Sequence, residues 1–343
     1  MTSFCQLCNS SNLQTNLQND AKSKSPLAIS FCNDCSLVQQ QEIPSDEELK
    51  IYYSHNYRQD YKSTYSPKAK YVRRAGMTAL DRIRFLESHI QLSNQVLLDI
   101  GAGGGEFVYM AQKRGLQSKG IEPNLGYSTF SKEQYGVEVK TAMLSDVQDS
   151  SADIVTLFHV FEHMAKPLEV MKKLYSSIKD GGYLFIEVPN ILQADASPHN
   201  IYFKAHLFYY SKFTLACAAS QYFDVVKVED KGNLKVLFKK KPQPSEKISS
   251  VQADQIEFSQ NRIKQKGWFE YLFNGKGVIK PLLRVDRVVT ESFIKKTSPK
   301  EILDSLYASR EDFYRPLSKY KLKKAAAWSG AGGLSIAVVA ALC

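Results

Sequence analysis

The sequence predicts an α/β fold, a doubly wound seven-stranded sheet with a small N-terminal metal module and a helical C-terminal region. Three observations predict it. Strand-length apolar segments alternate with helical patterns, a glycine-rich turn follows the first of these strands, and two Cys-x-x-Cys pairs precede them all. The expected units are a metal-binding module at 1–40, a Tyr-rich connector and helix at 41–93, the sheet domain at 94–242, and a basic, mainly helical region at 245–343.

Composition is ordinary for a packed protein, but charge is unevenly distributed. The chain has 343 residues and a net charge of +10. Residues 1–238 hold 25 basic and 25 acidic side chains, which leaves 20 basic and 10 acidic in residues 239–343. Solvated helix faces are the commoner explanation of such an excess, ahead of binding to phosphate, RNA or a membrane surface. The polar N-terminus lacks the pattern of a signal or transit peptide, so we expect a cytoplasmic protein.

The N-terminal cysteines have the spacing of a metal site. Cys5 and Cys8 form one chelating pair, and Cys32 and Cys35 form another after 23 intervening residues. In a reducing compartment this pattern favours a closed four-thiolate Zn²⁺ site over disulfides or redox chemistry. Four thiolates leave no open coordination position, so the predicted zinc is structural. Cys217 and Cys343 have no partner motif, and we interpret them as small apolar residues.

Residues 51–71 form an aromatic and polar connector. The stretch carries six tyrosines, among them Tyr57, which is a candidate substrate contact. Tyrosines offer flat apolar faces with hydroxyl groups, as a lid over a sugar-like ligand needs. Packing of the zinc module onto the main domain is an equally good interpretation, and both can hold. Pro67 then starts a predicted helix that runs to about His89.

The segment Val96–Ile100 is the first strand of the predicted sheet domain. Gly101, Gly103 and Gly105 follow it and allow the backbone to turn tightly beside a ligand. Glu106 stands at the spacing where a dinucleotide site has its third small residue, which disfavours a nicotinamide cofactor. Asp99 at the strand end favours a ligand with cationic groups.

Further strands are expected near residues 117–122, 137–140, 153–158, 183–188, 223–229 and 234–239. The last two are separated by Asp230–Asn233 alone, which is too short for a crossover, so we predict an antiparallel hairpin. Ligands of such sheets bind beyond the carboxyl ends of the strands. This directs attention to Glu122, to His159 and to Asn190, which follow three of the predicted strands.

Asp99, the three glycines and Glu122 resemble motifs I and II of class I S-adenosylmethionine-dependent methyltransferases. The resemblance extends over about residues 94–240 and implies a Rossmann-like domain with S-adenosylmethionine as cofactor. In that family the second acid holds the ribose hydroxyls, and residues ahead of the fourth strand wall the adenine. The cofactor-binding residues that the resemblance implies are Asp99, Gly101, Ala102, Gly103, Gly105, Glu122, Pro123, Ala142, Met143 and His159. A glycine turn without a cofactor is the alternative.

Glu162 and His163 follow the fourth predicted strand and are candidates for an acid and base pair. Adjacent residues on a helix point in different directions, which favours hydrogen bonds that brace the loop. The stretch also resembles quinone-precursor O-methyltransferases, in which a carboxylate three residues earlier helps to bind a catalytic cation. His159 takes that place here, which disfavours a magnesium-assisted catechol reaction.

His206 lies in the loop between the fifth strand and a helix that Ser211 is expected to cap. The segment from Tyr202 to Ser211 resembles sugar-nucleotide C-methyltransferases, as do the four cysteines and the Tyr-rich connector. In that family the histidine removes the substrate proton, so the resemblance implies His206 as general base. Tyr202 and Asn190 are candidate substrate contacts, like Tyr57. Ala205 replaces the acid that precedes this histidine, so the sequence offers His206 no adjacent carboxylate. A simple hydrogen-bonding role for His206 is the alternative.

The C-terminal third reads as helices punctuated by proline, with no pattern of a second α/β unit. Lys-Leu-Lys-Lys precedes an Ala- and Gly-rich end with an apolar run at Leu334–Leu342. The whole stretch Ala325–Cys343 is weakly apolar and barely long enough to span a bilayer, so we prefer a packed terminal strand or helix and expect no transmembrane span.

The sequence therefore predicts an S-adenosylmethionine-dependent methyltransferase that acts on a small polar acceptor, most plausibly a nucleotide-linked sugar or glycan precursor. One alternative is an RNA methyltransferase that holds phosphates with the zinc module and the basic C-terminal region, although the even charge of residues 1–238 counts against a nucleic acid partner. Another is a zinc and Rossmann-type scaffold without catalysis. The oligomeric state stays open.

Overall fold

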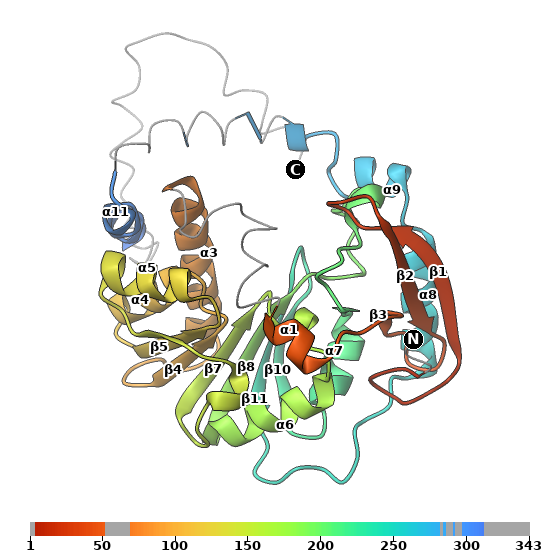
Figure 1. Ribbon diagram of the computed structural model, residues 1–343, viewed down its shortest axis with the longest axis horizontal. Coiled ribbons are helices and arrows are strands. Elements are labelled where there is room, and N and C mark those ends of the chain that lie inside the picture. The colour runs from red at the N-terminus through yellow and green to blue at the C-terminus, as the bar shows by residue number, and fades with distance from the viewer. Residues whose placement is uncertain (1–3, 52–68, 282–283, 286–290, 292–296, 312–343) are drawn as a thin grey trace, which may run out of the picture.

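A computed structural model describes residues 4–51, 69–281, 284–285, 291 and 297–311. Figure 1 shows one large sheet with helices on both faces and a smaller sheet beside it. Tyr57 and most of the Tyr-rich connector lie outside the described residues, as do Cys343 and the apolar run Leu334–Leu342.

The large sheet has seven strands in the order β10-β11-β8-β7-β4-β5-β6. Four neighbouring pairs from β6 to β8 are parallel, whereas β11 is antiparallel to both β8 and β10. The predicted doubly wound sheet with one antiparallel hairpin strand is confirmed. Its strands are β4 (Val96–Ile100), β5 (Gln117–Glu122), β6 (Val139–Thr141), β7 (Ala152–Phe158), β8 (Ile178–Val188), β10 (Phe223–Glu229) and β11 (Leu234–Lys240).

Two strand boundaries differ from the prediction. β6 begins at Val139 and pairs with β5 for only three residues, although Gly120 N of β5 also donates to Glu138 O just before it. β8 begins at Ile178, well ahead of the predicted residue 183, because the segment from Ile178 pairs with Ala152 before a register shift.

Helices cover both faces of the large sheet. On one face lie α3 (Ala69–Glu87), α4 (Glu106–Lys113) and α5 (Leu125–Tyr135), and on the other α6 (Pro167–Ser177) and α7 (Lys212–Ala219). The apolar residues of α3 recur every three or four positions, so one stripe of the helix is buried against the sheet. The predicted N-cap of α7 is present, since the Ser211 side chain accepts a hydrogen bond from Thr214 N.

A second sheet joins the N-terminus to the middle of the chain. It has the order β1-β2-β3-β9, in which β1 (Leu13–Asn19), β2 (Pro26–Cys32) and β3 (Val38–Gln40) come from the N-terminal module. The fourth strand, β9 (Phe208–Tyr209), belongs to the loop that carries His206. The short helix α1 (Asp46–Ile51) follows this module. Sequence analysis did not predict this pairing, because two residues are too few to show a strand pattern.

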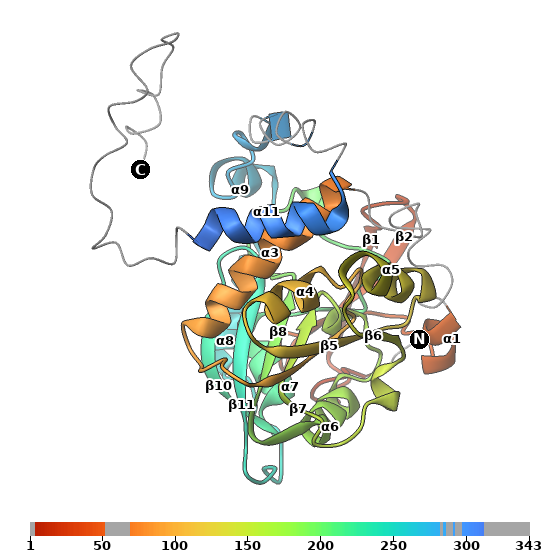
Figure 2. The same ribbon diagram turned by 90° about the vertical axis from the view of Figure 1, so that its left-hand side faces the viewer.

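The C-terminal region is helical where it is described, with α8 (Ala253–Lys264), α9 (Trp268–Phe273) and α11 (Pro299–Glu311). Figure 2 shows α11 lying across α3, where Leu303 fits against Gly76. Among the helices of the described residues, none is both long and apolar enough to cross a bilayer.

Candidate functional site

A cavity of about 920 Å³ opens at the carboxyl ends of the strands β4, β5 and β7. This is the edge at which sheets of this type bind ligands, and the volume suits a nucleoside with a second small molecule. Residues from both faces of the sheet and from the N-terminal part of the chain line it. They include Glu47, Leu49, Arg82, Gly101, Glu122, Pro123, Ala142, Met143, Phe158, His159, Val160, His163 and Lys166.

The glycine turn forms one wall of this cavity. Gly101 has a φ of +73°, and a Cβ atom there would lie 2.4 Å from Val160 Cγ2, so that only glycine fits. The turn also positions Glu122, because Gly103 N donates a hydrogen bond of 3.0 Å to Glu122 Oε2. The Glu122 side chain is almost fully buried, but it still lines the cavity. A carboxylate held in this way is suited to accept hydrogen bonds from a ligand.

The cofactor residues implied by the sequence divide into two groups. Six of them line the cavity, namely Gly101, Glu122, Pro123, Ala142, Met143 and His159, whereas Asp99, Ala102, Gly103 and Gly105 do not. Asp99 lies beneath the cavity, where Thr156 Oγ1 donates a hydrogen bond of 2.6 Å to its carboxylate. Burial raises the pKa of Asp99 to about 7 against the opposing effects of Thr156 and Arg82.

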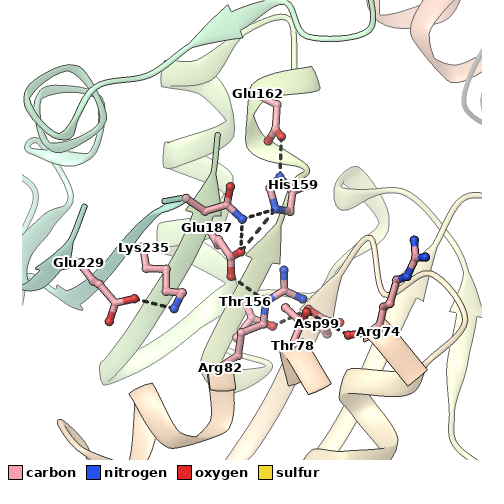
Figure 3. A network of polar contacts seen from close by, with 11 residues as sticks. Arg74, Thr78, Arg82, Asp99, Thr156, His159, Glu162, Glu187, Glu229 and Lys235 are labelled. Atoms are coloured by element: carbon pink, nitrogen blue, oxygen red, sulfur yellow. Dashed lines mark hydrogen bonds and ion pairs between the residues drawn. The ribbon is translucent and has the colours of Figure 1, made fainter. Parts of the chain in front are cut away.

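Acidic and basic side chains alternate next to the cavity, in the order Asp99, Arg82, Glu187, His159 and Glu162. Figure 3 shows these side chains and the contacts between them. Arg82 on α3 donates from Nε to Glu187 Oε2 at 2.7 Å, and its guanidinium lies 3.9 Å from the centre of the Phe158 ring. The other carboxylate oxygen of Glu187 lies 3.4 Å from His159 Nε2. The sequence analysis missed Arg82. In the sequence it is only one of several basic residues on an amphipathic helix, and nothing there distinguishes it from a solvent-exposed arginine. Among the described residues, the terminal nitrogens of Arg82 have no hydrogen-bond partner.

His159 connects these alternating charges to the candidate acid and base residues. Its Nδ1 atom lies 3.4 Å from Glu162 Oε1, and its backbone has a φ of +56°, which is uncommon for a residue with a side chain. Burial opposes a charge on the ring, but contacts with Glu162 and Glu187 outweigh it and raise the pKa of His159 to about 9. His159 is therefore a cation between two carboxylates at neutral pH.

Glu162 is a buried carboxylate with spare hydrogen-bonding capacity. Only 1% of the residue is exposed, and neither of its carboxylate oxygens has a hydrogen-bond partner among the described residues. Burial by itself would raise its pKa, but the neighbouring histidines, His159 first, lower the pKa of Glu162 to about 2. An ionised carboxylate in this position gains free energy from any donor that a ligand brings.

The expectation that Glu162 and His163 point apart is wrong. Both lie in a short 3₁₀ turn, Phe161–His163, and His163 Nε2 is 3.9 Å from Glu162 Oε1. One ligand atom each from Glu162, His163 and His206 lies within 4.8 Å of the other two. The expected bracing is present as well, since His163 Nδ1 lies 2.7 Å from Ala205 O.

His206 therefore has a carboxylate neighbour, although Ala205 supplies none. Its ring packs edge-on against His163, with the ring centres 5.0 Å apart, and His163 lies between it and the cavity. Burial, and next the proximity of His163, lower the pKa of His206 to about 3, whereas Glu162 acts in the opposite direction. A neutral His206 can accept a proton, and Glu162 can stabilise the resulting cation. Two imidazoles and a carboxylate at this spacing could also hold a divalent cation.

The other two described substrate candidates do not line the cavity. Asn190 donates from Nδ2 to Asp230 O at 3.0 Å, and its Oδ1 atom accepts a hydrogen bond from Leu192 N. These contacts brace the loop after β8. Tyr202 packs against Tyr209 with ring centres 5.1 Å apart and lines a smaller cavity of about 170 Å³ between the N-terminal sheet and α8.

The four N-terminal cysteines converge as predicted. Their Sγ atoms lie within 4.8 Å of one another, with 3.5 Å between those of Cys5 and Cys35 and 3.6 Å between those of Cys8 and Cys32. These distances exclude disulfides, whose sulfur atoms are about 2.05 Å apart. They approach the edge of a tetrahedron with Zn–S bonds of about 2.3 Å, so the residues fit a four-thiolate zinc site.

The N-terminal module holds the loop that carries His206. Gln40 N donates to Leu207 O at 2.9 Å, and Gln40 Nε2 lies 2.7 Å from His206 O and 2.8 Å from Lys204 O. Asp20 adds a further contact, because its Oδ1 atom accepts a hydrogen bond of 2.7 Å from Lys204 N. The position of His206 thus depends on residues more than 160 positions earlier in the chain.

Comparison with known proteins identifies the domain that contains the cavity. Residues 69–227 match the family model of a methyltransferase domain. A ubiquinone biosynthesis O-methyltransferase of Paraburkholderia phymatum is 28% identical over 117 residues, which cover 32% of this chain and 50% of that protein. The same enzyme of Stutzerimonas stutzeri is 28% identical over 118 residues, with the same two shares covered. The chain thus spans about half the length of these curated relatives.

Solved structures with a similar arrangement are also known. A methyltransferase from Listeria monocytogenes, described as dependent on S-adenosylmethionine, has a TM-score of 0.41 at 13% identity and covers 48% of this chain and 99% of its own. A protein from Thermotoga maritima described as a possible histamine N-methyltransferase has a TM-score of 0.40 at 18% identity, with 50% and 92% covered. The residues that match the methyltransferase family model include the glycine turn, Glu122 and the three neighbours Glu162, His163 and His206.

Proposed function

We propose that the chain transfers a methyl group from S-adenosylmethionine to a small polar acceptor. The proposal starts from the match of residues 69–227 to a methyltransferase domain. The observation that carries the proposal is the pairing of Gly101 and Glu122 in the wall of one cavity at the carboxyl edge of the sheet. When bound, S-adenosylmethionine would supply an electrophilic methyl group on a sulfonium centre. The protein's contribution is to bind, orient and desolvate the two reactants.

The donor end of the cavity has side chains that fit the parts of such a cofactor. Glu122 is positioned to hold ribose hydroxyls, and Ala142 and Met143 provide an apolar wall for a base. The free nitrogens of Arg82 suit the carboxylate of an amino-acid moiety, because a guanidinium binds a carboxylate through two parallel hydrogen bonds. Asp99 contributes indirectly, because its hydrogen bond with Thr156 joins the ends of β4 and β7 next to the cavity.

The acceptor end is the cluster of Glu162, His163 and His206. We infer that Glu162 accepts a hydrogen bond from an acceptor hydroxyl, which would give its carboxylate the hydrogen bond that the described residues do not supply. His206 would take the proton from an acceptor that reaches past His163, and the Glu162 carboxylate would stabilise the positive charge formed on the imidazole. The new bond would join the acceptor atom to the methyl carbon, and the bond from that carbon to sulfur would break with its electron pair left on sulfur. Because the acceptor loses a proton in the same reaction, the acceptor atom ends uncharged.

A nucleotide-linked sugar or related glycan precursor is the acceptor class that we favour. The four-cysteine module and the Tyr202–Ser211 segment, which resemble sugar-nucleotide C-methyltransferases, support it. A hydroxyl-rich acceptor also matches the buried carboxylate and the two imidazoles at this end of the cavity. The replacement of a carboxylate by His159 counts against a metal-bound catechol, although the curated relatives are named for ubiquinone biosynthesis.

The donor site is tested by calorimetry with S-adenosylhomocysteine. We expect the wild type to bind and Glu122→Ala to bind at least about tenfold more weakly, because charge-assisted hydrogen bonds contribute about 1.5–3 kcal/mol. Glu133→Ala on the exposed face of α5 is the matched control and should bind as the wild type does. A wild type that does not bind S-adenosylhomocysteine ends the proposal. Transfer of labelled methyl groups to a panel of nucleotide-linked sugars and phenols then separates the two acceptor classes.

The glycine turn gives a second test with a close control. Gly101→Ala places a methyl group against Val160 and should abolish detectable S-adenosylhomocysteine binding. Gly136 has nearly the same backbone angle, with a φ of +68°, but nothing lies within 4 Å of its added Cβ. Gly136→Ala therefore carries only the cost of the left-handed conformation, about 1 kcal/mol of stability, and should keep its affinity. Equal binding losses in both variants, measured by calorimetry, would mean that close approach at Gly101 is unimportant.

A further inference from the structure

Exposed apolar side chains gather on α9 and the turn after it. We define the α9 patch as residues 264–281 together with 284 and 285. The exposed fractions are 51% for Trp268, 74% for Phe269, 63% for Phe273, 61% for Val278, 43% for Ile279 and 63% for Val285. Exposed aromatic and aliphatic side chains that lie so close together in the sequence mark a contact surface rather than isolated apolar residues.

The same surface is cationic. It carries Lys264, Lys266, Lys276, Lys280 and Arg284, and its one acid is Glu270. Glu270 is buried and pairs with Arg262 at 2.6 Å, so the residues of the patch contribute no exposed carboxylate, and the exposed Asp195 lies beside Lys266 and Lys280 at its edge. Cations that surround exposed aromatic and aliphatic groups are typical of segments that lie on anionic membranes.

The α9 patch is seated firmly on the protein. Lys266 Nζ donates to Gln193 O and Lys280 Nζ donates to Asp195 O. The Trp268 ring packs edge-on against His199 at 5.5 Å, and Gly275 approaches Ala194 O so closely that a Cβ atom would lie 2.2 Å from it. These contacts attach the patch to the loop after β8, the loop that continues to His206. Figures 1 and 2 show α9 at the rim of the molecule, away from the core of the large sheet.

We propose that the α9 patch docks the protein on an anionic phospholipid surface. Lipid fits better than RNA because Val278, Ile279 and Val285 are aliphatic and offer no stacking face or hydrogen bond to a base. It fits better than a second copy of the chain because two such patches would bring like charges together. The sequence continues the same chemistry, since Lys319, Lys321, Lys323 and Lys324 precede a stretch from Ala325 to Cys343 without charged residues.

Vesicle flotation of the full-length protein tests this docking. We expect the wild type to float with vesicles that contain phosphatidylcholine and phosphatidylglycerol. With vesicles of phosphatidylcholine alone, a much smaller fraction of the protein should float. The double variant Phe269→Ser and Phe273→Ser should lose at least about tenfold in partitioning, because both rings are exposed and contact each other. Lys276→Glu should weaken binding to the anionic vesicles alone. Leu17→Ser, an equally exposed apolar residue on β1, should change nothing.

Other results overturn the proposal. Binding that survives in both α9 variants would place the lipid contact in another segment. A patch-dependent dimer in gel filtration, or patch-dependent binding to single-stranded RNA without binding to vesicles, would assign the surface to a different partner. Circular dichroism and the affinity for S-adenosylhomocysteine check that each variant is folded. The inference does not depend on the proposed acceptor, so a failure here leaves the methyl-transfer proposal intact.

Discussion

Replacement of His206 by alanine is expected to lower kcat by about 10²–10⁴-fold, the usual contribution of a general base. Binding of S-adenosylhomocysteine should be unchanged, because His206 does not line the cavity in which Glu122 and Gly101 lie. Two measurements on the same preparation check this: the rate of methyl transfer to nucleotide-linked sugars, and the affinity for S-adenosylhomocysteine by calorimetry. Glu162→Gln, which keeps the side-chain shape and removes the charge, should also lower kcat, since the protonated imidazole then lacks its counter-charge.

The pH dependence separates a catalytic role from a structural one. Burial lowers the pKa of His206 to about 3, so the ring is unprotonated at every pH above that value. We therefore expect kcat to stay level as the pH falls from about 8 to about 5, with no loss near the ordinary histidine pKa of about 6.5. Unchanged turnover in His206→Ala removes His206 from the mechanism. Loss of turnover in His163→Ala alone would make His163, which lines the cavity, the base.

Loss of the N-terminal metal is expected to have the second large effect. Structural zinc contributes about 10–16 kcal/mol to the folding of small zinc peptides, and residues 4–40 contain only three short strands. The double variant Cys32→Ser and Cys35→Ser should lose zinc and the order of this sheet, and with it the contacts of β3 to β9. Turnover should then fall while S-adenosylhomocysteine still binds, because Gly101 and Glu122 come from the large sheet.

Metal analysis and hydrogen exchange measure this effect. Wild type purified without chelator should contain about one zinc per chain, and the variant should exchange faster over residues 202–209. Gln40→Ala isolates the link, since it should keep the zinc but lower kcat by releasing the carbonyls of Lys204 and His206. Gln14→Ala, on the exposed face of β1, is the control and should be neutral. Full turnover in metal-free protein would disconnect the module from catalysis.

The fold could be predicted closely because its signals are local. The strand β4 ends in a glycine turn that requires positive φ, and the four-residue connection Asp230–Asn233 permits only a hairpin. The cysteine pairs lie within single turns of the chain. Predictions failed where a signal was only two or three residues long, as at β9, or where a register shift extended a strand, as at β8.

The candidate site was predicted in part. Glu122, Ala142 and Met143 line the cavity, because a parallel sheet brings the ends of neighbouring strands to one edge. Arg82 was missed because nothing in α3 shows that its guanidinium reaches Glu187 on a strand 105 residues later.

The sequence by itself determined the positions of most strands in the large sheet, the glycine turn and the two cysteine pairs, because periodicity, turn length and chelate spacing act within short windows. Only the tertiary structure decided that Glu162, His163 and His206 come together. It also decided that Gln40 binds the loop that carries His206. The physical reason is that contacts between distant segments depend on how helices and sheets pack. The loop that carries His206 packs on the 3₁₀ turn Phe161–His163, since Leu207 N donates to Glu162 O and His163 Nδ1 donates to Ala205 O.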